Sequence, residues 1–426
     1  HEYPFCWRCD TALMYYATKS WYVNVSKHRH RMIQFNQSIH WEPEHIKEGR
    51  FGEWIANAKD WGFSRTRYWG TPLPIWKCEK CTHIEVIGSV AELKEKGKNI
   101  PAKLDLHKPY VDGITLTCEK CTHPMKREPY VMDVWYDSGS APFAQLHYPF
   151  ENKELFETFF PYHYIAEAID QTRGWFYHLH VLATLLFDSY ATKSIVCAGH
   201  LVDKQGQKMS KSKGNVINPN EVFEKYGVDA LRLQMCLTPA GDSKRIGMDS
   251  FKESVQPMLT ILWNSLQFAI PLLEKGKALL DREEIPPLQK EDAWLLSRLA
   301  DTHERVTNGL ENYYFHECTR ALLQFVNEDL SRNYIKWVRE RAKEEDAAVA
   351  YTFYQTFHIL SQLLAPLAPY ISEAMYEACK GNEKSVHLTR WPKSMERNTQ
   401  LEQSMRIAQE VIASGLSLRE KIKMPV

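Results

Sequence analysis

The chain has 426 residues, about three times the usual length of a single domain, so we expect two to four folding units. Its 44% hydrophobic and 25% charged residues are an ordinary globular composition, which excludes disordered, collagen-like and small disulfide-linked proteins. The 53 basic and 53 acidic residues balance, so the net charge gives no sign of a polyanionic partner. No apolar run approaches the roughly 18 residues that a membrane span needs, and we expect no membrane role.

Residues 1–50 mix a strand-like run at 21–25 with turn residues and are predicted to form a connector. The sequence does not begin with Met and has no apolar leader, so we expect the chain to be a piece of a longer protein. Cys6 and Cys9 form a Cys-x-x-Cys pair, half of a metal site whose second pair is expected upstream of residue 1. Apolar side chains at helical spacing in residues 51–62 predict an amphipathic helix.

Two further Cys-x-x-Cys pairs share the same six residues, Cys-Glu-Lys-Cys-Thr-His. They supply four thiolates, which suit two halves of one tetrahedral zinc site: Cys78, Cys81, Cys118 and Cys121. A redox dithiol would need only one pair at the start of a helix, and a cytosolic chain would not keep a disulfide. Residues 78–130 are therefore predicted to form a small zinc ribbon.

Strand and helix signals alternate in the middle of the chain. Residues 164–167 and 194–198 are strand candidates of the buried type, and residues 172–188 predict a helix between them. This is the spacing of a βαβ unit, so we expect an α/β region. From about residue 250 onward the pattern changes to amphipathic helices without strand signals, which predicts an all-α helical bundle. The long helices expected there are 293–310, 317–338 and 347–364.

The loop at residues 203–215 holds four lysines, two serines and two glycines. Ammonium groups, hydroxyls and a closely approaching backbone together suit a polyphosphate. The spacing differs from that of a P-loop, so a Walker-type NTPase is not supported. For an arbitrary stretch of this composition, a solvated charged loop would be the better interpretation.

The string Lys-Met-Ser-Lys-Ser within this loop resembles the signature loop of class I aminoacyl-tRNA synthetases. In that family the lysines stabilise the charge on pyrophosphate while the amino acid carboxylate attacks the α-phosphate of ATP. The resemblance implies that Lys208 and Lys211 are catalytic. The ATP contacts that it implies are Lys208, Ser210, Lys211, Ser212 and His200.

Three other strings narrow the resemblance to isoleucyl-tRNA synthetases. Residues 61–74 are similar to the family's Ser-Arg-x-Arg-Tyr-Trp-Gly-Thr-Pro segment, and residues 133–139 to its Asp-x-Trp-Phe-Asp-Ser-Gly strand. Residues 167–176 are similar to the isoleucine-specific form of a segment in which the valine and leucine enzymes carry other residues. The resemblance runs over nearly the whole chain.

An aminoacyl-adenylate site must hold an ammonium group, a ribose, a phosphate and one apolar side chain. By resemblance, Glu167 contacts the adenylate, Asp170 the α-ammonium group, and Gln171 the amino acid or ribose end. Trp175 and Trp135 are expected to form walls of the aliphatic pocket. Without the motif, a charge pair at a helix start and core tryptophans would be the better interpretation.

The implied function is ATP-dependent activation of L-isoleucine and its transfer to tRNA(Ile), with Mg²⁺ accompanying ATP and a structural Zn²⁺. The family's His-x-Gly-His signature and its editing domain are expected upstream of residue 1, so the whole protein is expected to charge tRNA and residues 1–426 alone are not. We expect a cytoplasmic monomer.

On this resemblance the fold is an α/β Rossmann-like catalytic half with a small zinc-ribbon insert, followed by an all-α helical bundle. The predicted domains are a connector from the editing domain (1–50), a Rossmann-like segment (51–77), the zinc ribbon (78–130), a Rossmann-like half (131–202), the lysine loop with a stem-contact region (203–290) and the α-helical anticodon-binding domain (291–426).

Two alternatives and one smaller feature stay open. The chain can belong to a valyl- or leucyl-tRNA synthetase, or to a non-catalytic synthetase-like paralogue that binds RNA or an amino acid. The intact lysine loop argues against a paralogue without catalysis. Residues 330–341 place basic and aromatic side chains along one helix, which suits either contact with tRNA or a solvated basic face.

Overall fold

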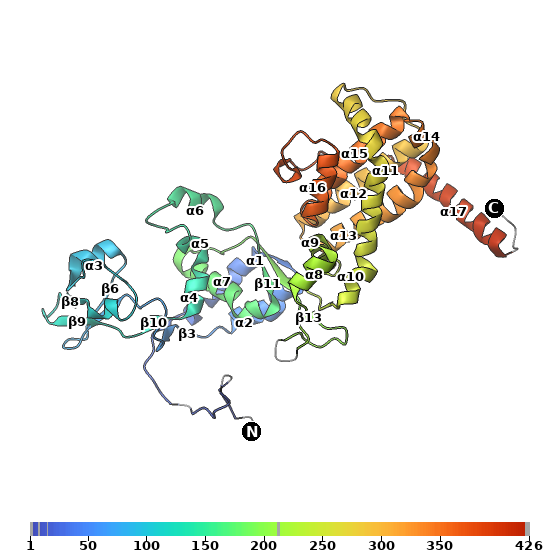
Figure 1. Cartoon of the computed structure of the whole chain (residues 1–426). Coiled ribbons are helices and arrows are strands. Elements are labelled where there is room, and N and C mark those ends of the chain that lie inside the picture. Colours follow the sequence, from blue (N-terminus) through green and yellow to red (C-terminus); the bar gives the residue numbers. More distant parts are fainter. Residues whose placement is uncertain (1–2, 7–8, 15, 211–213, 422–426) are drawn as a thin grey trace. The chain divides into compact units, whose positions relative to one another are not determined.

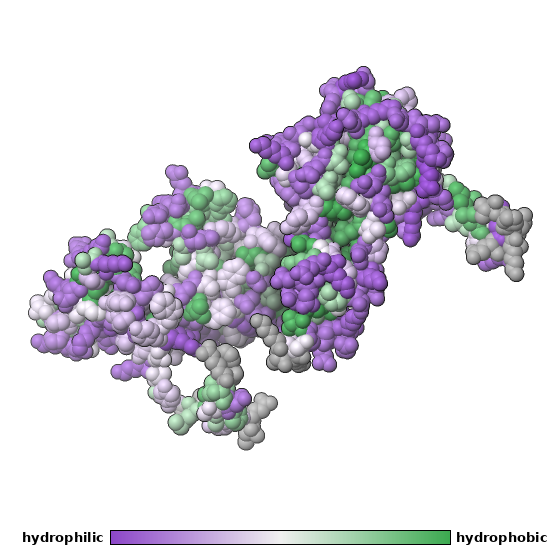
Figure 2. All heavy atoms as spheres, viewed as in Figure 1, coloured by the Kyte–Doolittle hydropathy of each residue, from purple (hydrophilic) through white to green (hydrophobic). Residues whose placement is uncertain are grey.

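The computed structural model of the chain describes residues 3–6, 9–14, 16–210 and 214–421 (Figure 1). The chain forms two compact units, residues 1–197 and 198–426. Each unit has its own buried apolar core. Polar side chains cover much of the visible surface of both units (Figure 2). None of the helices that the structure describes is long and apolar enough to cross a membrane.

The α/β part of the first unit is a three-stranded sheet with the order β11-β12-β2. Its strands are β2 (His40–Glu42), β11 (Ile165–Ala168) and β12 (Ser194–Ala198), and β12 runs parallel to β2. The connection from β11 to β12 is a short 3₁₀ turn, η4 (Ile169–Arg173), followed by α7 (Trp175–Phe187). The predicted βαβ arrangement is confirmed, with the first turn tighter than an α-helix.

Helix α7 is the central helix of this unit. Residues 176–184 of α7 are all buried, as expected for a helix that is apolar on nearly every side. Trp41 on β2 packs against Phe51 with ring centroids 4.7 Å apart and against Phe176 on α7 at 6.1 Å. The indole N–H of Trp41 donates to the side-chain oxygen of Asn36 at 2.9 Å, so its polar atom is satisfied inside the core.

The prediction of a helix over residues 51–62 is wrong in its second half. The chain forms a π-helical turn, η2 (Lys47–Gly52), and a single α-turn, α2 (Glu53–Ala56). Residues Trp61–Gly62 are instead strand β3, antiparallel to β1 (Tyr22–Val23). Backbone pairing with β1 and a buried hydrogen bond of the Trp61 indole outweigh the helical periodicity of the sequence.

A five-stranded antiparallel sheet with the order β6-β5-β9-β8-β7 forms the predicted ribbon. Its strands are β5 (Ile75–Cys78), β6 (Ile84–Val86), β7 (Gly97–Lys98), β8 (Thr115–Thr117) and β9 (Pro124–Arg127). It has a separate small core around Trp76 and Met125. The sheet begins at Ile75, slightly before the predicted start of the ribbon.

The other described elements of the first unit are short. They are η1 (Ser26–His28), α1 (Arg29–Gln37), β4 (Ser64–Arg65), α3 (Val90–Lys96), η3 (Tyr110–Gly113), β10 (Val131–Met132), α4 (Val134–Gly139), α5 (Ala141–Ala144) and α6 (Lys153–Phe159).

The second unit begins with strand β13, which pairs in parallel with β14 after two intervening helices, and then continues as helices. These elements are β13 (Leu201–Val202), α8 (Pro219–Tyr226), α9 (Val228–Cys236), β14 (Lys244–Arg245), α10 (Met248–Ser254), α11 (Gln256–Asp281), α12 (Lys290–Glu311), α13 (Phe315–Gln324), η6 (Phe325–Ile335), α14 (Arg339–Lys343), α15 (Ala347–Leu364), α16 (Pro369–Ala378), η7 (Val386–Leu388) and α17 (Thr399–Lys421).

The bundle confirms the predicted all-α region. Helix α15 has the predicted bounds and packs closely on α11, because a Cβ added at Gly276 would lie 2.2 Å from the carbonyl oxygen of Ala350. The helix predicted over 317–338 is α-helical only in its first part and continues as the π-helical η6. A helix-wide hydrophobic pattern does not reveal such a change in backbone pitch.

Candidate active site and metal centre

The two predicted carboxylates lie where strand β11 ends. Glu167 is exposed near the end of β11, and Asp170 is exposed in η4 directly after it. Neither forms an ion pair with another residue that the structure describes. The carboxyl end of a strand in an open α/β sheet is the usual place for ligand binding. Both charges are therefore open to solvent at such an edge.

Gln171 links the Asp170 carboxylate to the start of α7. Its side-chain oxygen accepts a hydrogen bond from the backbone N–H of Trp175 at 2.9 Å, and its side-chain nitrogen donates to Asp170 Oδ2 at 3.0 Å. The indole N–H of Trp175 donates to the backbone oxygen of Ser138 at 2.9 Å. These bonds fix both faces of the Gln171 amide and the direction of the Trp175 ring.

Trp135 on α4 comes within reach of the same group of residues. A Cβ added at Gly174 would lie 2.6 Å from the Gln171 side-chain oxygen and 2.7 Å from Cη2 of Trp135. Only a glycine therefore allows this approach without displacing one of the two side chains. The structure thus brings Asp170, Gln171, Trp175 and Trp135 together, although the last is far away in sequence.

Two charged residues near Trp135, Asp133 and Arg65, and the indole of Trp61 were not predicted from the sequence. Asp133 is buried, forms a salt bridge with Arg65 and accepts a hydrogen bond from the indole N–H of Trp61 at 3.1 Å. It also caps α4 by accepting from the backbone N–H of Trp135 at 3.3 Å. The signal was present, since these residues lie inside the two strings at 61–74 and 133–139. Another missed residue is His178, whose ring stacks on Trp135.

The lysine loop lies in the second unit. The side-chain oxygen of Asn215 accepts from the backbone N–H of Ser210 at 2.9 Å, and its nitrogen donates to Asp203 Oδ2 at 2.8 Å. Asp203 Oδ1 in turn accepts from the backbone N–H of Gln207 at 2.8 Å. Lys208 is exposed at the centre of this loop. The predicted Lys211 and Ser212 lie outside the described residues.

His200 immediately precedes strand β13. Its backbone oxygen accepts a hydrogen bond from the N–H of Lys244 at 2.9 Å, and its side chain is half-buried. The preceding Gly199 is pressed against the loop at Asp242, because an added Cβ would lie 2.3 Å from that residue's backbone oxygen. The backbone of His200 is held by this bond to Lys244. Its contact with ATP stays a prediction.

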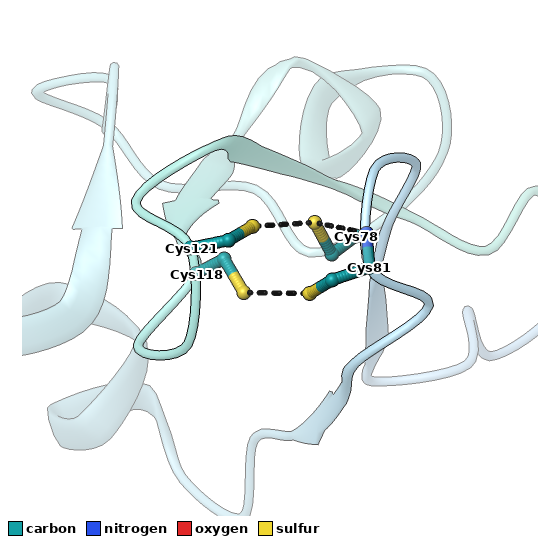
Figure 3. Close-up of side chains that lie close together, drawn as sticks. All are labelled: Cys78, Cys81, Cys118 and Cys121. Carbon is teal, nitrogen blue, oxygen red and sulfur yellow. Dashed lines mark hydrogen bonds between the residues drawn. The ribbon is translucent and has the colours of Figure 1, made fainter.

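The four predicted metal ligands converge at one point (Figure 3). Their sulfur atoms all lie within 4.8 Å of one another, with Cys78 Sγ 3.5 Å from Cys121 Sγ and Cys81 Sγ 3.5 Å from Cys118 Sγ. A tetrahedral zinc with Zn–S bonds of about 2.3 Å has sulfur atoms about 3.8 Å apart. The cluster therefore fits one zinc ion, and these separations are too long for disulfides.

The two halves of the cluster have the same backbone geometry. Thr82 and Thr122 adopt positive φ angles of 60° and 58°, a costly conformation for a β-branched residue.

The backbone N–H of Cys81 points to the Cys78 sulfur and helps to lower the pKa of Cys78 to about 7. A backbone N–H lowers the pKa of Cys121, but burial and the neighbouring thiols raise it to about 12. Because the four thiols lie so close together, ionisation of all of them at once is unfavourable in the absence of a cation. A bound dication would favour it.

Cys6 and Cys9 do not form a comparable cluster. The backbone N–H of Cys6 donates to Thr11 at 2.8 Å, and Cys9 Sγ lies 3.3 Å from the Thr11 hydroxyl. The group at Cys78 is the only one of three or more metal-binding side chains among the described parts of the chain. The half site at Cys6 and Cys9 stays a prediction.

The prediction of one basic helix at residues 330–341 is wrong, because these residues span the end of η6 and the start of α14 with a break at Val338. Part of this segment is buried in the bundle. Tyr334 is buried, and its hydroxyl donates to Asp292 at 2.8 Å. Arg341 pairs with the buried Asp292 at 2.7 Å. Lys336 and Arg339 remain exposed. Any contact of this segment with RNA would therefore involve exposed cations rather than stacking on Tyr334.

Comparison with protein families matches residues 10–247 to the family described as tRNA synthetases class I (I, L, M and V). Residues 292–426 match the anticodon-binding domain of tRNA ligase.

Curated relatives are similar over nearly the whole chain. An isoleucine–tRNA ligase of Thermus thermophilus is 46% identical over 413 residues, covering 92% of this chain and 39% of the relative. One from Clostridium acetobutylicum is 42% identical over 434 residues, covering 98% of this chain and 42% of the relative. The chain thus spans about two fifths of the length of these relatives.

Solved structures resemble the fold at low sequence identity. The ternary LeuRS–tRNA–LeuAMS complex of Agrobacterium radiobacter has a TM-score of 0.61 at 21% identity, covering 84% of this chain and 46% of that chain. A Mycobacterium tuberculosis methionyl-tRNA synthetase in complex with methionyl-adenylate has a TM-score of 0.60 at 18% identity, covering 88% of this chain and 65% of that chain.

Proposed function

Because the chain belongs to the family of class I tRNA synthetases (I, L, M and V), we propose that the whole protein is an isoleucine–tRNA ligase. In the proposed reaction, isoleucine and ATP form isoleucyl-adenylate and pyrophosphate. The isoleucyl group then passes to a hydroxyl of the terminal ribose of tRNA(Ile), and AMP leaves. The observation that carries this proposal is the group of Asp170, Gln171, Trp175 and Trp135 at the end of β11. The identity of the chain to isoleucine–tRNA ligases supports it.

Each residue of this group has a role that its surroundings permit. Asp170 is an exposed carboxylate and suits the α-ammonium group of isoleucine. Trp175 and Trp135 present apolar rings to the aliphatic side chain, and Gln171 positions both Asp170 and Trp175. Glu167 is assigned to the adenylate. Catalysis by such a site consists of positioning and charge stabilisation, and needs no covalent nucleophile.

The lysine loop is assigned to the phosphates of ATP. Lys208, Ser210, Lys211, Ser212 and His200 are the proposed contacts. Asn215 supports the loop by bonds to Ser210 and Asp203. Mg²⁺ bound with ATP supplies charge neutralisation on the phosphates. Lys208 and Lys211 stabilise the negative charge that develops on the leaving pyrophosphate.

We assign a structural zinc ion to Cys78, Cys81, Cys118 and Cys121. It would fasten the turn after β5 to the turn after β8, since each turn supplies two thiolates. We also propose that the bundle binds tRNA(Ile) and that the protein is a cytoplasmic monomer. The proposed domains are those predicted from the sequence.

The experiment is amino-acid-dependent ATP/pyrophosphate exchange by the full-length protein with isoleucine, valine and leucine. Isoleucine should give the highest kcat/KM, and Lys208→Ala should lower kcat by about 100-fold, as expected for loss of one charge-stabilising group. Lys204→Ala is the matched control, because Lys204 belongs to the same loop but pairs with Asp249. Tight isoleucine or tRNA binding without any exchange would favour the non-catalytic paralogue.

A further inference from the structure

The indole of Trp135 is supported from behind by an aromatic ring of helix α7. The His178 imidazole lies almost parallel to it, with an interplanar angle of 5° and ring centroids 5.3 Å apart. This is the geometry of an offset stack, which stabilises a pair of rings beyond the area they bury. The orientation of Trp135 therefore depends on the position of His178.

His178 is itself held in place from several directions. Its Nδ1 lies 2.7 Å from the backbone oxygen of Gly174, and because a carbonyl only accepts, Nδ1 carries the proton. The Trp61 ring lies 4.6 Å away at 59° and the Tyr177 ring 5.0 Å away at 79°. The His178 residue is only 6% exposed. Burial lowers its pKa, so the ring beside the apolar wall is neutral.

The opposite constraint on Trp135 comes from Gly174. The edge of the indole at Cη2 already occupies the space next to Gly174 that a Cβ would need. The backbone N–H of Trp135 is bound to Asp133, which also accepts from Trp61. Trp61 thus contacts His178 and holds the residue that caps Trp135. The indole therefore has little room to turn unless His178 is removed.

We propose that His178 is a positioning residue that sets the selectivity for the aliphatic side chain by fixing Trp135 as a wall of the pocket. This inference rests on the proposed function, in which Trp135 contacts isoleucine. One methylene group in an apolar pocket changes kcat/KM by about 10- to 200-fold, and only if the wall does not move. A mobile indole would accept valine and isoleucine more equally.

The test uses the full-length protein and compares kcat/KM for isoleucine and valine in ATP/pyrophosphate exchange. His178→Ala should lower the isoleucine-to-valine ratio by about 10-fold, mainly through KM for isoleucine, because the pocket shape is lost while the charge-stabilising groups remain. His178→Phe keeps a flat ring behind Trp135 without the bond to Gly174. It should retain the ratio to within about 3-fold.

His180→Asn is the matched control. His180 is equally buried on α7, but it faces Met32 and Phe51 rather than Trp135. It should lower stability without changing the ratio. The inference is overturned if folded His178→Ala keeps the wild-type isoleucine-to-valine ratio of kcat/KM, or if His180→Asn lowers this ratio as much as His178→Ala does. Either result leaves the proposed function standing. If the wild-type protein shows no exchange driven by isoleucine, the proposed function and the inference fall together.

Discussion

Gln171 and Trp175 are joined across the first turn of α7 by a side-chain-to-backbone hydrogen bond of 2.9 Å. The first N–H groups of a helix have no partner within the helix, so Gln171 satisfies one of them. Its other amide atom binds Asp170 at 3.0 Å. One side chain thereby couples the start of the buried helix to the carboxylate proposed to bind the substrate ammonium group.

The two bonds of Gln171 can be separated by substitution. Gln171→Ala loses both, so we expect about 1 kcal/mol lower stability and at least a 10-fold higher KM for isoleucine in exchange. Gln171→Glu keeps the acceptor for the Trp175 N–H but places a second carboxylate beside Asp170. It should be nearly as stable as the wild type and still have a raised KM. Normal KM in both variants would contradict the role given to Gln171.

Metal analysis of the protein should find about one zinc per chain at the four cysteines. Cys118→Ser should abolish zinc binding and destabilise the five-stranded sheet, because a thiolate is lost from a buried tetrahedral site. Cys318→Ser is the control, since Cys318 is buried alone in the bundle. Full zinc content in Cys118→Ser, measured by atomic absorption, would show that the metal is bound elsewhere.

His180 predicts a pH dependence of stability in the first unit. It is 2% exposed, and burial lowers its pKa to about 4. The unfolded chain, with a pKa of about 6.5, binds a proton in the range between these values and the folded chain does not. The free energy of unfolding should therefore fall as the pH is lowered from about 6.5 to 4, by up to about 3 kcal/mol.

Urea unfolding between pH 4 and 7 checks this dependence. His180→Asn does not titrate, although its shorter side chain loses the bond that His180 Nε2 makes to the Met32 carbonyl oxygen at 2.8 Å. The difference in free energy of unfolding between the wild type and this variant should become smaller as the pH is lowered, because only the wild type loses the contribution of His180. His163→Asn, at an exposed position, serves as the control and should follow the wild type. Parallel curves for wild type and His180→Asn would exclude His180 as the cause.

Asp292 is predicted to be one of the most sensitive positions in the bundle. It is fully buried and binds Arg341 at 2.7 Å and the hydroxyl of Tyr334 at 2.8 Å. Asp292→Ala leaves the buried Tyr334 hydroxyl without this acceptor and removes one of the three carboxylates that pair with Arg341, which should cost about 1–3 kcal/mol in thermal or urea unfolding. Glu328→Ala removes an exposed pair with Arg332 and should cost less than about 1 kcal/mol. Equal effects of the two would contradict this difference.

The sequence predicted helices and strands well where one pattern ran without interruption. Strand β12 and helix α15 have the predicted bounds, and α12 extends only slightly beyond them. Prediction was wrong at Trp61, because pairing with β1 depends on a partner far away in sequence. The π-helical η6 was missed because the prediction assumed an α-helical pitch throughout residues 317–338.

The sequence by itself identified the short motifs that carry the proposed chemistry: the four clustered cysteines, the lysine loop and residues 167–176. These groups are recognisable because their spacing is local. Only the tertiary structure decided which distant side chains support them, such as His178 behind Trp135 and Asp133 beneath Trp61. Such contacts arise when separate segments pack into one core, so the motifs at 61–74 and 133–139 include Trp61 and Asp133 but do not record the contact between them.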